Sequence, residues 1–330
     1  MKPFAIKIAT LVELLFMIGA LSYSSAVPAK KLYKYQDENG IWHFSDQAPN
    51  TDRPVTVRQM KVERRQKIRL IQGGDRQQPT FSLHNDYGGP VQVEVDFAEN
   101  NNARSVPELP HRFVVQPGQS DTLLRIFGED ERLGFSVSLR YYEVPGPPLP
   151  RYESTHVYWP PLAPGMSFPI SQGFGGEFSH NDLQNRYALD IAMPVGTPIH
   201  AARAGVVMEA ENDFFDGGVK PTYRDRANHI RIIHEDGSMA VYAHLDVDRA
   251  QVYPGMPVEA GQLIGYSGNT GFTTGPHLHF VIQYNRGMEL VSAPFVFMTR
   301  MGQAEAPAVG AWLTGIDNDT SERGRGGGEK

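Results

Sequence analysis

A pair of histidines one residue apart constrains the fold of this chain more than any other feature. They stand in residues 275–280, Gly-Pro-His-Leu-His-Phe, which lead into the apolar and β-branched run of residues 281–282. Because side chains alternate along a strand, His277 and His279 should project from one face and the intervening apolar residues from the other. Such a strand can offer two imidazoles to one site and still be anchored in a core. Paired histidines on an ordinary polar face are the alternative at this point.

The absence of cysteine narrows the chemistry available to the chain. Its 330 residues are enough for two or three domains, and a net charge of −6 with an ordinary apolar fraction gives no indication of a nucleic-acid binder or a disordered protein. Without thiols, cysteine catalysis, disulfides and zinc–thiolate sites are excluded. Histidine, aspartate and glutamate are the side chains left to bind a metal.

The first 26 residues have the pattern of a secretory signal. Two lysines precede an apolar run over residues 8–21, and small residues follow it. This arrangement predicts a signal peptide over residues 1–26, with cleavage after Ala26 or Ala29, and export to the periplasm or cell envelope. Glu13 weighs against the alternative, an uncleaved anchor, because a carboxylate is costly inside a membrane span.

Two short segments follow the signal. Residues 30–54 place an Asn-Gly pair between two aromatic-rich runs, which predicts a β-hairpin. This segment resembles a small aromatic hairpin module found near the N-terminus of many exported bacterial proteins. Residues 55–78 are rich in arginine and lysine and are expected to form a basic linker or short helix. The alternative role of this basic segment is association with an acidic wall polymer or a membrane surface.

The middle of the chain predicts a small β-domain without a catalytic site. Between residues 79 and 152, short alternating runs separated by turn residues indicate an antiparallel β-sandwich, with a structural or interaction role. We expect its strands over residues 80–85, 91–97, 111–115, 122–126 and 134–142. The proline-rich residues 153–166 predict a stiff linker, and residues 303–330 predict a disordered tail.

Polar residues with metal-ligand chemistry accumulate in the C-terminal domain, expected over residues 167–300. Asp190 lies on an alternating apolar run, where a carboxylate is costly unless it is paired, hydrogen-bonded or bound to a metal. His180 lies upstream in a polar loop. Farther along, strand alternation should place Tyr242 and His244 on one face.

Two imidazoles and one carboxylate, with a fourth position for water, are what a catalytic zinc ion requires. The metal lowers the pKa of its water to roughly 7 and polarises a carbonyl, and histidines beside it can orient that water and stabilise the oxyanion. His180, Asp190 and His279 can supply the ligands for one zinc ion per chain. His244 and His277 can supply the assisting pair. No other interpretation uses all five side chains.

The ordered motifs of this region resemble a known family. They are Tyr-Ala-Leu-Asp at 187–190, Pro-Val-Gly-Thr-Pro at 194–198, Ala-Gly-Val-Val at 204–207, Tyr-Ala-His-Leu at 242–245, Gly-Gln-Leu-Ile-Gly at 261–265, Ser-Gly-Asn-Thr-Gly at 267–271 and Gly-Pro-His-Leu-His-Phe at 275–280. Together they resemble the lysostaphin-type zinc endopeptidases that cut peptidoglycan cross-bridges. The resemblance implies a mainly β fold, in which an antiparallel β-sheet metallopeptidase domain carries a groove over its sheet.

The resemblance also implies residue roles and an activity. Asp190 and His279 correspond to two metal ligands of the family. His244 and His277 correspond to its two histidines that act on the water and the oxyanion. The implied activity is hydrolysis of peptide cross-links by attack of a zinc-bound water, without a covalent enzyme intermediate. Peptidoglycan is then the expected partner and nucleic acid is not, and we expect a monomer.

One family position differs in this chain. The remaining histidine ligand of the family usually lies four residues before the aspartate, where this chain has Arg186, which cannot bind zinc. We expect His180 to replace it, reaching the site through a longer loop. Relatives that keep the fold but lose ligands regulate other wall hydrolases. A non-catalytic, wall-binding regulator is therefore the alternative function.

Other residues of this domain are expected to have structural or wall-forming roles. His200 is expected at the surface or in a turn. His229 and His234 fall on opposite faces of one strand, and structural roles are expected for both. The loop over residues 212–227 is either a groove wall or a flexible insertion. Residues 272–274 directly precede the histidine pair and are expected to shape the substrate site.

Overall fold

The computed structural model of the protein describes residues 4–9, 30–38, 42–45, 48–60, 66–153 and 155–317. Regular structure in these ranges is almost entirely β-strand, and the one helix they contain is the 3-10 turn η1 (Pro221–Tyr223). The prediction of a mainly β protein is therefore confirmed. Within the same ranges, no helix combines the length and apolarity needed to cross a bilayer.

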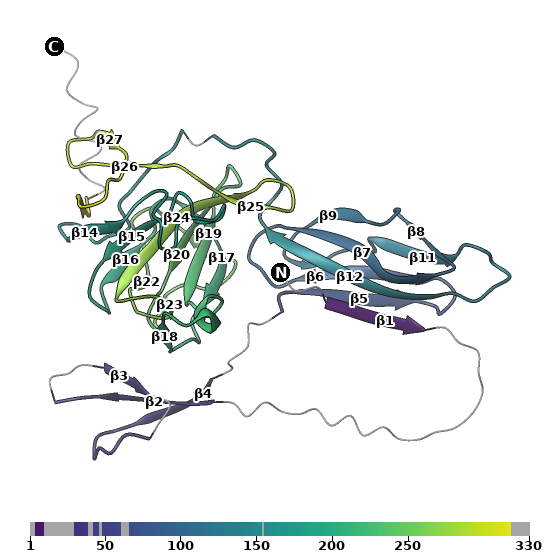
Figure 1. The fold of residues 1–330 in the computed structure, drawn as a ribbon, viewed down its shortest axis with the longest axis horizontal. Helices are drawn as coiled ribbons and strands as arrows, with labels where there is room; N and C mark the ends of the chain where they lie inside the picture. The colour runs from purple at the N-terminus through teal and green to yellow at the C-terminus, as the bar shows by residue number, and fades with distance from the viewer. Residues whose placement is uncertain are drawn as a thin grey trace, which may run out of the picture.

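The N-terminal segment forms a small antiparallel sheet, drawn below the two larger units in Figure 1. Strand β2 (Lys30–Gln36) pairs with β3 (Trp42–Ser45) as the predicted hairpin, and also with β4 (Thr56–Met60). Residues 4–9 of the expected signal form β1 (Phe4–Ala9), which pairs with a strand of the middle unit. Residues 10–29 lie outside the described residues, so the signal peptide stays a prediction.

The middle unit is built from two antiparallel sheets. One has the strand order β1-β12-β7-β9, and the other has the order β10-β6-β11-β8 with β5 beside β6. Alternate residues of these strands point inward, as Phe81 and Leu83 do on β6, and pack into a common core. The strands are β5 (Ile68–Gly74), β6 (Pro79–Asn85), β7 (Val91–Asn101), β8 (Ala103–Val106), β9 (His111–Val115), β10 (Gly118–Gln119), β11 (Leu124–Gly128) and β12 (Ser136–Pro145).

Two segments that were expected to be linkers contain β-strands instead. Residues 55–78, expected as a basic linker, contain β4 and β5, because Ile68 and Leu70 alternate with exposed Arg69 and pack into the core of the middle unit. The proline-rich residues 153–166 include β13 (Val157–Tyr158). They are held by burial of Tyr158 in the core of the C-terminal unit.

The expected tail is also partly ordered. Residues 303–317 contribute β27 (Ala304–Glu305) and β28 (Trp312–Thr314), and β28 pairs with β14 at the edge of the large sheet. The physical reason is main-chain pairing with an otherwise open strand edge, which the composition of the tail does not reveal. Residues 318–330 lie outside the described residues.

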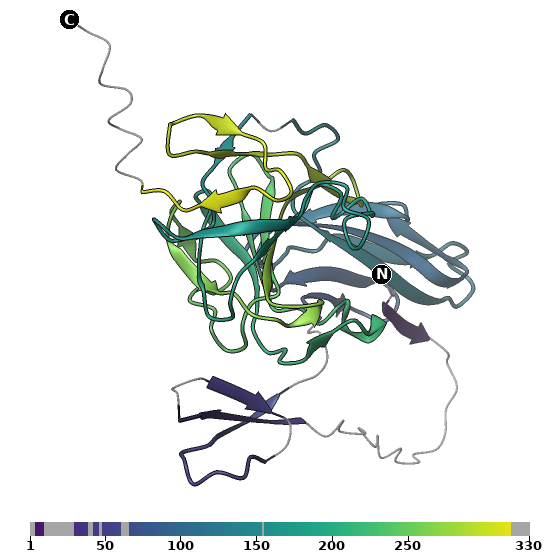
Figure 2. The ribbon, with the colours of Figure 1, turned by 60° about the vertical axis from the view of Figure 1, so that its left-hand side comes forward.

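A nine-stranded sheet forms the C-terminal unit, and it adjoins the middle unit in both views (Figures 1 and 2). Its order is β21-β17-β19-β20-β24-β15-β14-β28, and β25 also pairs with β24. Its strands are β14 (Ser167–Gln172), β15 (Leu189–Ala192), β17 (Gly205–Glu211), β19 (His229–Ile233), β20 (Met239–Ala243), β21 (Pro257–Val258), β24 (His277–Asn285), β25 (Leu290–Ala293) and β28. Smaller pairings join β16 (Pro198–His200) to β22 (Leu263–Tyr266), β18 (Gly217–Gly218) to β23 (Gly271–Phe272), and β13 to β26 (Val296–Met298) and β27.

One face of this sheet is packed and the other is open. On β24, Leu278, Phe280 and Ile282 are fully buried in the core, as alternation predicted. His277 and His279 lie on the opposite face and line a cleft. The strand is therefore held by three large apolar side chains while it presents its histidines, each burial contributing roughly 1.5–3 kcal/mol.

His234 is buried at the end of β19 and should make the stability of the protein depend on pH. Its side chain is 4% exposed, its Nδ1–H donates to the Ala204 carbonyl over 2.8 Å, and burial lowers its pKa to about 4. The unfolded chain takes up this proton near pH 6.5. The contribution of neutral His234 to the free energy of unfolding is thus fully present above about pH 6.5 and is lost as the pH falls towards 4.

We expect the advantage of the wild type over His234→Gln in free energy of unfolding to shrink by about 2 kcal/mol between pH 7 and pH 4.5. Denaturant unfolding of both proteins at the two pH values measures this change. Parallel pH profiles would contradict the buried, neutral state of His234. The other buried histidines act on both proteins alike and cancel in the comparison.

Candidate metal centre and cleft

A single register row crosses the open face of the sheet. Paired positions run from Gln172 through Asp190, His279, Ala243 and His229 to Glu211. Because directly paired residues on neighbouring strands point to the same side of a sheet, these side chains share the face opposite the core. The row forms the floor of this open face. Residues that can bind a metal lie towards its first end, and charged residues lie at its other end.

Three ligand-capable atoms converge at the first end of this row. His180 Nε2 lies 3.2 Å and His279 Nδ1 lies 2.9 Å from Asp190 Oδ1. All three atoms lie within 4.8 Å of one another, with His180 buried and the other two residues partly exposed. His180 arrives from the loop over residues 173–187, which we call the metal-ligand loop. The structure thus brings together the three residues predicted as ligands.

A second hydrogen bond orients each of the two histidines. His180 Nδ1–H donates to the Gly173 carbonyl over 2.8 Å, which leaves the lone pair on Nε2. His279 Nε2–H donates to Asn185 Oδ1 over 3.2 Å, which leaves the lone pair on Nδ1. In each case the nitrogen facing Asp190 is the one free to bind a metal. Partners of this kind fix the tautomer and orientation of metal-binding imidazoles.

The Asp190 carboxyl is held in its ionised form. Gln172 Nε2 donates to Oδ2 over 3.1 Å, and Oδ1 faces the histidines. Burial would raise the pKa of this carboxyl, but the adjacent imidazoles of His180 and His279 outweigh burial and hold the pKa well below its ordinary range. Burial lowers the pKa of His180, but the hydrogen bond and charge of Asp190 outweigh it and raise that pKa. Two oriented imidazoles and an ionised carboxylate fit a zinc ion with an open fourth position.

His244 and His277 lie beside this cluster, with ring centroids 4.5 Å apart. Their Nδ1–H groups donate to the carbonyls of Thr270 over 2.7 Å and Gly275 over 2.8 Å, which leaves Nε2 of both rings as an acceptor. Burial, followed by the neighbouring His277 and His279, lowers the pKa of His244 to about 3, and burial also lowers the pKa of His277. Both rings are therefore neutral near pH 7, with Nε2 directed away from its own backbone partner as a hydrogen-bond acceptor.

The position of His244 corrects one sequence prediction. Alternation placed Tyr242 and His244 on one face, but Tyr242 is fully buried in the core while His244 lines the cleft. Strand β20 ends at Ala243, and His244 has a φ of 61°. This left-handed conformation is uncommon for a residue with a Cβ, and it breaks the alternation of the strand. The imidazole therefore lies on the face of Ala243 and His279.

The cleft over this face has a volume of ≈ 760 Å³ and is lined by the register row from Asp190 to Glu211. The loop over residues 212–227 forms part of its wall through Phe214 and Arg224, and residues 272–274 line it as expected. His229, expected to be structural, also lines the cleft. His200 is on β16 and contacts the Gly261 carbonyl, with no role in the cleft lining.

Two residues that orient the candidate metal ligands were not predicted from the sequence. Gln172 reaches Asp190 from the neighbouring strand, which only the register of the sheet reveals. Asn185 follows Asp182 by three positions, and the Asp182 carboxylate accepts the backbone N–H of Asn185 over 2.9 Å. An aspartate followed by polar residues is a turn signal, so the turn was readable, but its position beside His279 was not.

Comparison with known protein families identifies this part of the chain. Residues 184–290 match the family described as Peptidase family M23. These residues form an M23 peptidase domain. Residues 19–67, which include the aromatic hairpin, match a domain of unknown function, DUF4124. The family resemblance inferred from the motifs is therefore confirmed. The matched M23 span includes Asp190, His244, His277 and His279, whereas His180 lies just before it.

Relatives of the M23 domain include a glycyl-glycine endopeptidase, lysostaphin and a peptidoglycan DD-endopeptidase. Glycyl-glycine endopeptidase ALE-1 of Staphylococcus capitis is 40% identical over 97 residues, 29% of this chain and 24% of the relative. Lysostaphin of Staphylococcus simulans is 35% identical over 122 residues, 36% of this chain and 22% of the relative. Peptidoglycan DD-endopeptidase ShyA of Vibrio cholerae is 41% identical over 91 residues, 28% of this chain and 18% of the relative.

These matches concern the M23 domain and not whole proteins. This chain spans less than a quarter of the length of each of the three relatives, at 24%, 22% and 18%. The solved structure of lysostaphin from Staphylococcus simulans is 34% identical, covers 36% of this chain and 43% of that chain, and aligns with a TM-score of 0.28. The comparisons support an M23 peptidase with peptidoglycan endopeptidases among its relatives.

Proposed function

We propose that this protein is an exported zinc metalloendopeptidase that hydrolyses peptide cross-links of peptidoglycan in the periplasm or cell envelope. The observation that carries the proposal is the convergence of three oriented ligand atoms, from His180, Asp190 and His279, beside two neutral histidines in one cleft. The peptidoglycan substrate is supported by the names of the M23 relatives. Export is supported by the signal pattern of residues 1–26 and by the location of such a substrate outside the membrane.

The residues present would hold one zinc ion per chain through His180 Nε2, Asp190 Oδ1 and His279 Nδ1. When bound, such an ion lowers the pKa of water and polarises the substrate carbonyl. His244 and His277 can accept the proton of an attacking water at Nε2, because both rings are neutral and their Nδ1 atoms are already donors. Once protonated, either ring can donate to the developing oxyanion or return the proton to the leaving amine.

The floor of the cleft suits an extended peptide. Ala243 lies within the register row, and Val241 and Val281 form the next pair on the same face of the two strands, so small or β-branched side chains line this part of the cleft. Two strand spacings separate His279 from His229, roughly 10 Å, which is the length of about three residues of extended chain. A peptide can therefore place a carbonyl at the ligand end while its next residues follow the floor.

Purified protein supplied with zinc is expected to cleave cross-linked muropeptides into products that mass spectrometry can identify. A chelator should abolish the activity and added zinc should restore it. Asp190→Ala should be inactive with or without zinc, because the site loses its anionic ligand. Asp121→Ala, at an exposed position of the middle unit, should keep wild-type activity. A zinc-loaded wild type that cleaves no muropeptide would contradict the proposal and favour a regulator of other hydrolases.

A further inference from the structure

The middle unit and the M23 domain share one hydrophobic core. Met208, Ile233 and Met239 of the M23 domain pack into the same cluster as the sandwich strands. The backbone approach is also close, because Gly88 N–H donates to the Met208 carbonyl over 2.8 Å. A Cβ at Gly88 would lie only 2.1 Å from the Val207 carbonyl oxygen. The middle unit is therefore fixed against β17, the strand that carries the charged end of the cleft.

Lys67 of the middle unit forms ion pairs with this charged end. Its Nζ lies 2.6 Å from Glu209 Oε1 and 2.5 Å from Glu211 Oε1. Glu209 is fully buried, and its Oε2 faces His229 Nε2 at 2.9 Å and Arg231 Nε at 3.5 Å. Burial would raise the pKa of Glu209, but its contacts with His229, Lys67 and Arg231 hold it well below its ordinary range. A lysine from one unit thus compensates a buried carboxylate in the other.

The polar contacts continue from Arg231 to the metal-ligand loop. Arg231 Nη1 donates to Gln283 Oε1 over 2.7 Å, and Gln283 Nε2 donates to the Gln184 carbonyl over 2.8 Å. Arg231 and Gln283 are 7% and 4% exposed, so water does not readily replace these bonds. The residue after Gln184 is Asn185, whose Oδ1 accepts the hydrogen bond from His279. A contiguous chain of contacts therefore joins Lys67 to the partner of a metal ligand.

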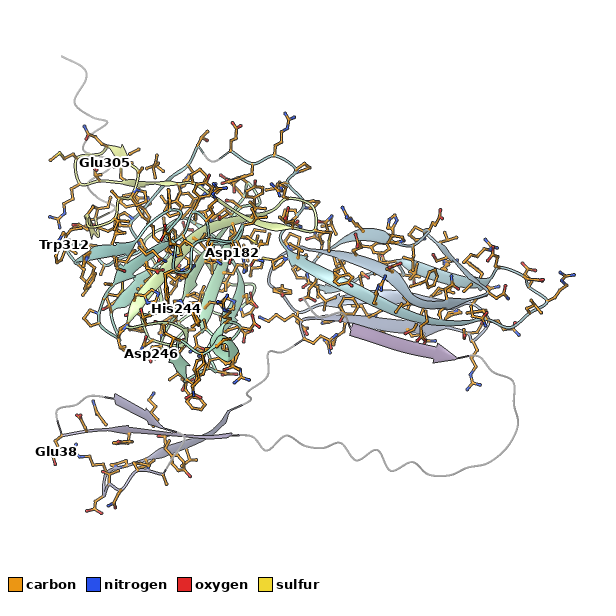
Figure 3. All side chains as sticks on the ribbon, viewed as in Figure 1. Glu38, Asp182, His244, Asp246, Glu305 and Trp312 are labelled. Atoms are coloured by element: carbon orange, nitrogen blue, oxygen red, sulfur yellow. The ribbon has the colours of Figure 1, made fainter. Side chains whose placement is uncertain are left out.

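The metal-ligand loop has a fixed local shape where this chain reaches it. Asp182 Oδ1 accepts the backbone N–H groups of Gln184 and Asn185, both at 2.9 Å, and Asn185 Nδ2 at 3.0 Å. The Asn185 amide must then direct Oδ1 at His279. Figure 3 labels Asp182 and His244, which both lie on the M23 half of the ribbon. Asp182 sets the shape of the turn, and Gln283 fixes the turn against the sheet.

We propose that the middle unit positions the metal-ligand loop through this network, with Lys67, Arg231 and Gln283 as positioning residues of the metal centre. The inference rests on the proposed zinc site, although not on cleavage of any peptide. Without Lys67, Arg231 becomes the main cation available to buried Glu209 and is drawn away from Gln283. The Gln283 amide then loses a partner, and its hold on Gln184 weakens.

Replacing Lys67 in the full-length protein tests the first link. Lys67→Met should weaken zinc affinity about 10-fold, measured by competition with a chromophoric chelator, which is the effect expected of an orienting partner. Lys67→Arg keeps the charge and should retain most of the affinity. Arg69→Met is the matched control, because Arg69 lies on β5 nearby but is exposed and pairs with Asp86 within the middle unit. It should bind zinc like the wild type.

A double-mutant cycle tests whether the contacts act as one chain. Gln283→Leu alone should weaken zinc binding by a similar factor, and Lys67→Met combined with Gln283→Leu should be little worse than either single variant. Fully additive losses would mean two separate effects and would overturn the inference. Lys67→Met combined with Glu209→Gln removes the buried charge that would draw Arg231 from Gln283, so zinc affinity should recover towards that of the wild type. A loss that persists in this double variant would contradict the mechanism.

A measurement without metal separates this inference from the proposed function. In the zinc-free protein, amide hydrogen exchange over residues 181–186 should be faster in Lys67→Met and Gln283→Leu than in the wild type, and unchanged in Arg69→Met. The inference alone would be overturned if the wild type cleaves muropeptides while both variants match its exchange rates and its zinc affinity. A wild type that binds zinc without cleaving muropeptides would overturn the proposed function alone. A wild type that binds no zinc would overturn both.

Discussion

Replacing His180 with alanine should leave the protein without zinc at concentrations that saturate the wild type. His180 Nε2 is one of three converging ligand atoms, and the other two belong to Asp190 and His279. Loss of one neutral donor leaves two ligands, and we expect zinc affinity to fall more than about 100-fold, beyond the loss typical of an orienting partner. Elemental analysis of the purified protein and competition with a chelator both measure this loss.

His200→Ala is the matched control for this experiment. His200 is another histidine of the C-terminal unit, but it is partly exposed on β16, contacts the Gly261 carbonyl and should not affect the metal. One zinc ion per chain is expected in the wild type and in this control. Full zinc occupancy in His180→Ala would show that another residue supplies the third ligand.

The fold was predictable wherever one face of a strand is buried. The alternation over residues 277–283 predicted both faces of β24, because burial of three apolar side chains leaves the histidines no other side. β9 occupies the expected residues 111–115, and the other expected strands of the middle unit begin and end within a few residues of their predicted bounds. In contrast, β5 was missed because the basic residues that precede it dominate the composition of the segment, although Ile68 and Leu70 pack inward.

The candidate site was predictable in its residue types and not in its geometry. Histidines and an aspartate in ordered motifs indicated the metal chemistry, but the register that sets Gln172 opposite Asp190 depends on pairing between strands distant in sequence. The φ of 61° at His244 likewise depends on the tertiary packing around it, since only a small fraction of non-glycine residues adopt that conformation. The charged end of the cleft was missed for a related reason. Its lysine comes from a different unit.

His244→Ala and His277→Ala should each keep zinc and lose activity, which separates them from the ligand variants. Both side chains lie beside the metal ligands, yet their lone pairs are on Nε2 and neither belongs to the converging set of three atoms. Loss of a positioned base or oxyanion donor typically costs about 10² to 10⁴ in kcat. The value of kcat on cross-linked muropeptides, measured with zinc content on the same samples, tests this expectation.

The two variants should also differ from each other in how much the substitution destabilises the folded protein. His244 holds a left-handed backbone conformation and donates to the Thr270 carbonyl, so His244→Asn, a residue that tolerates this conformation, is the better-folded companion variant. It should fold like the wild type and remain as slow as His244→Ala, because an amide does not accept a proton near pH 7. Rescue of activity by asparagine would mean that His244 only shapes the cleft. Undiminished hydrolysis in zinc-loaded His277→Ala would remove that ring from the mechanism, leaving His244 as the sole proton acceptor beside the metal ligands.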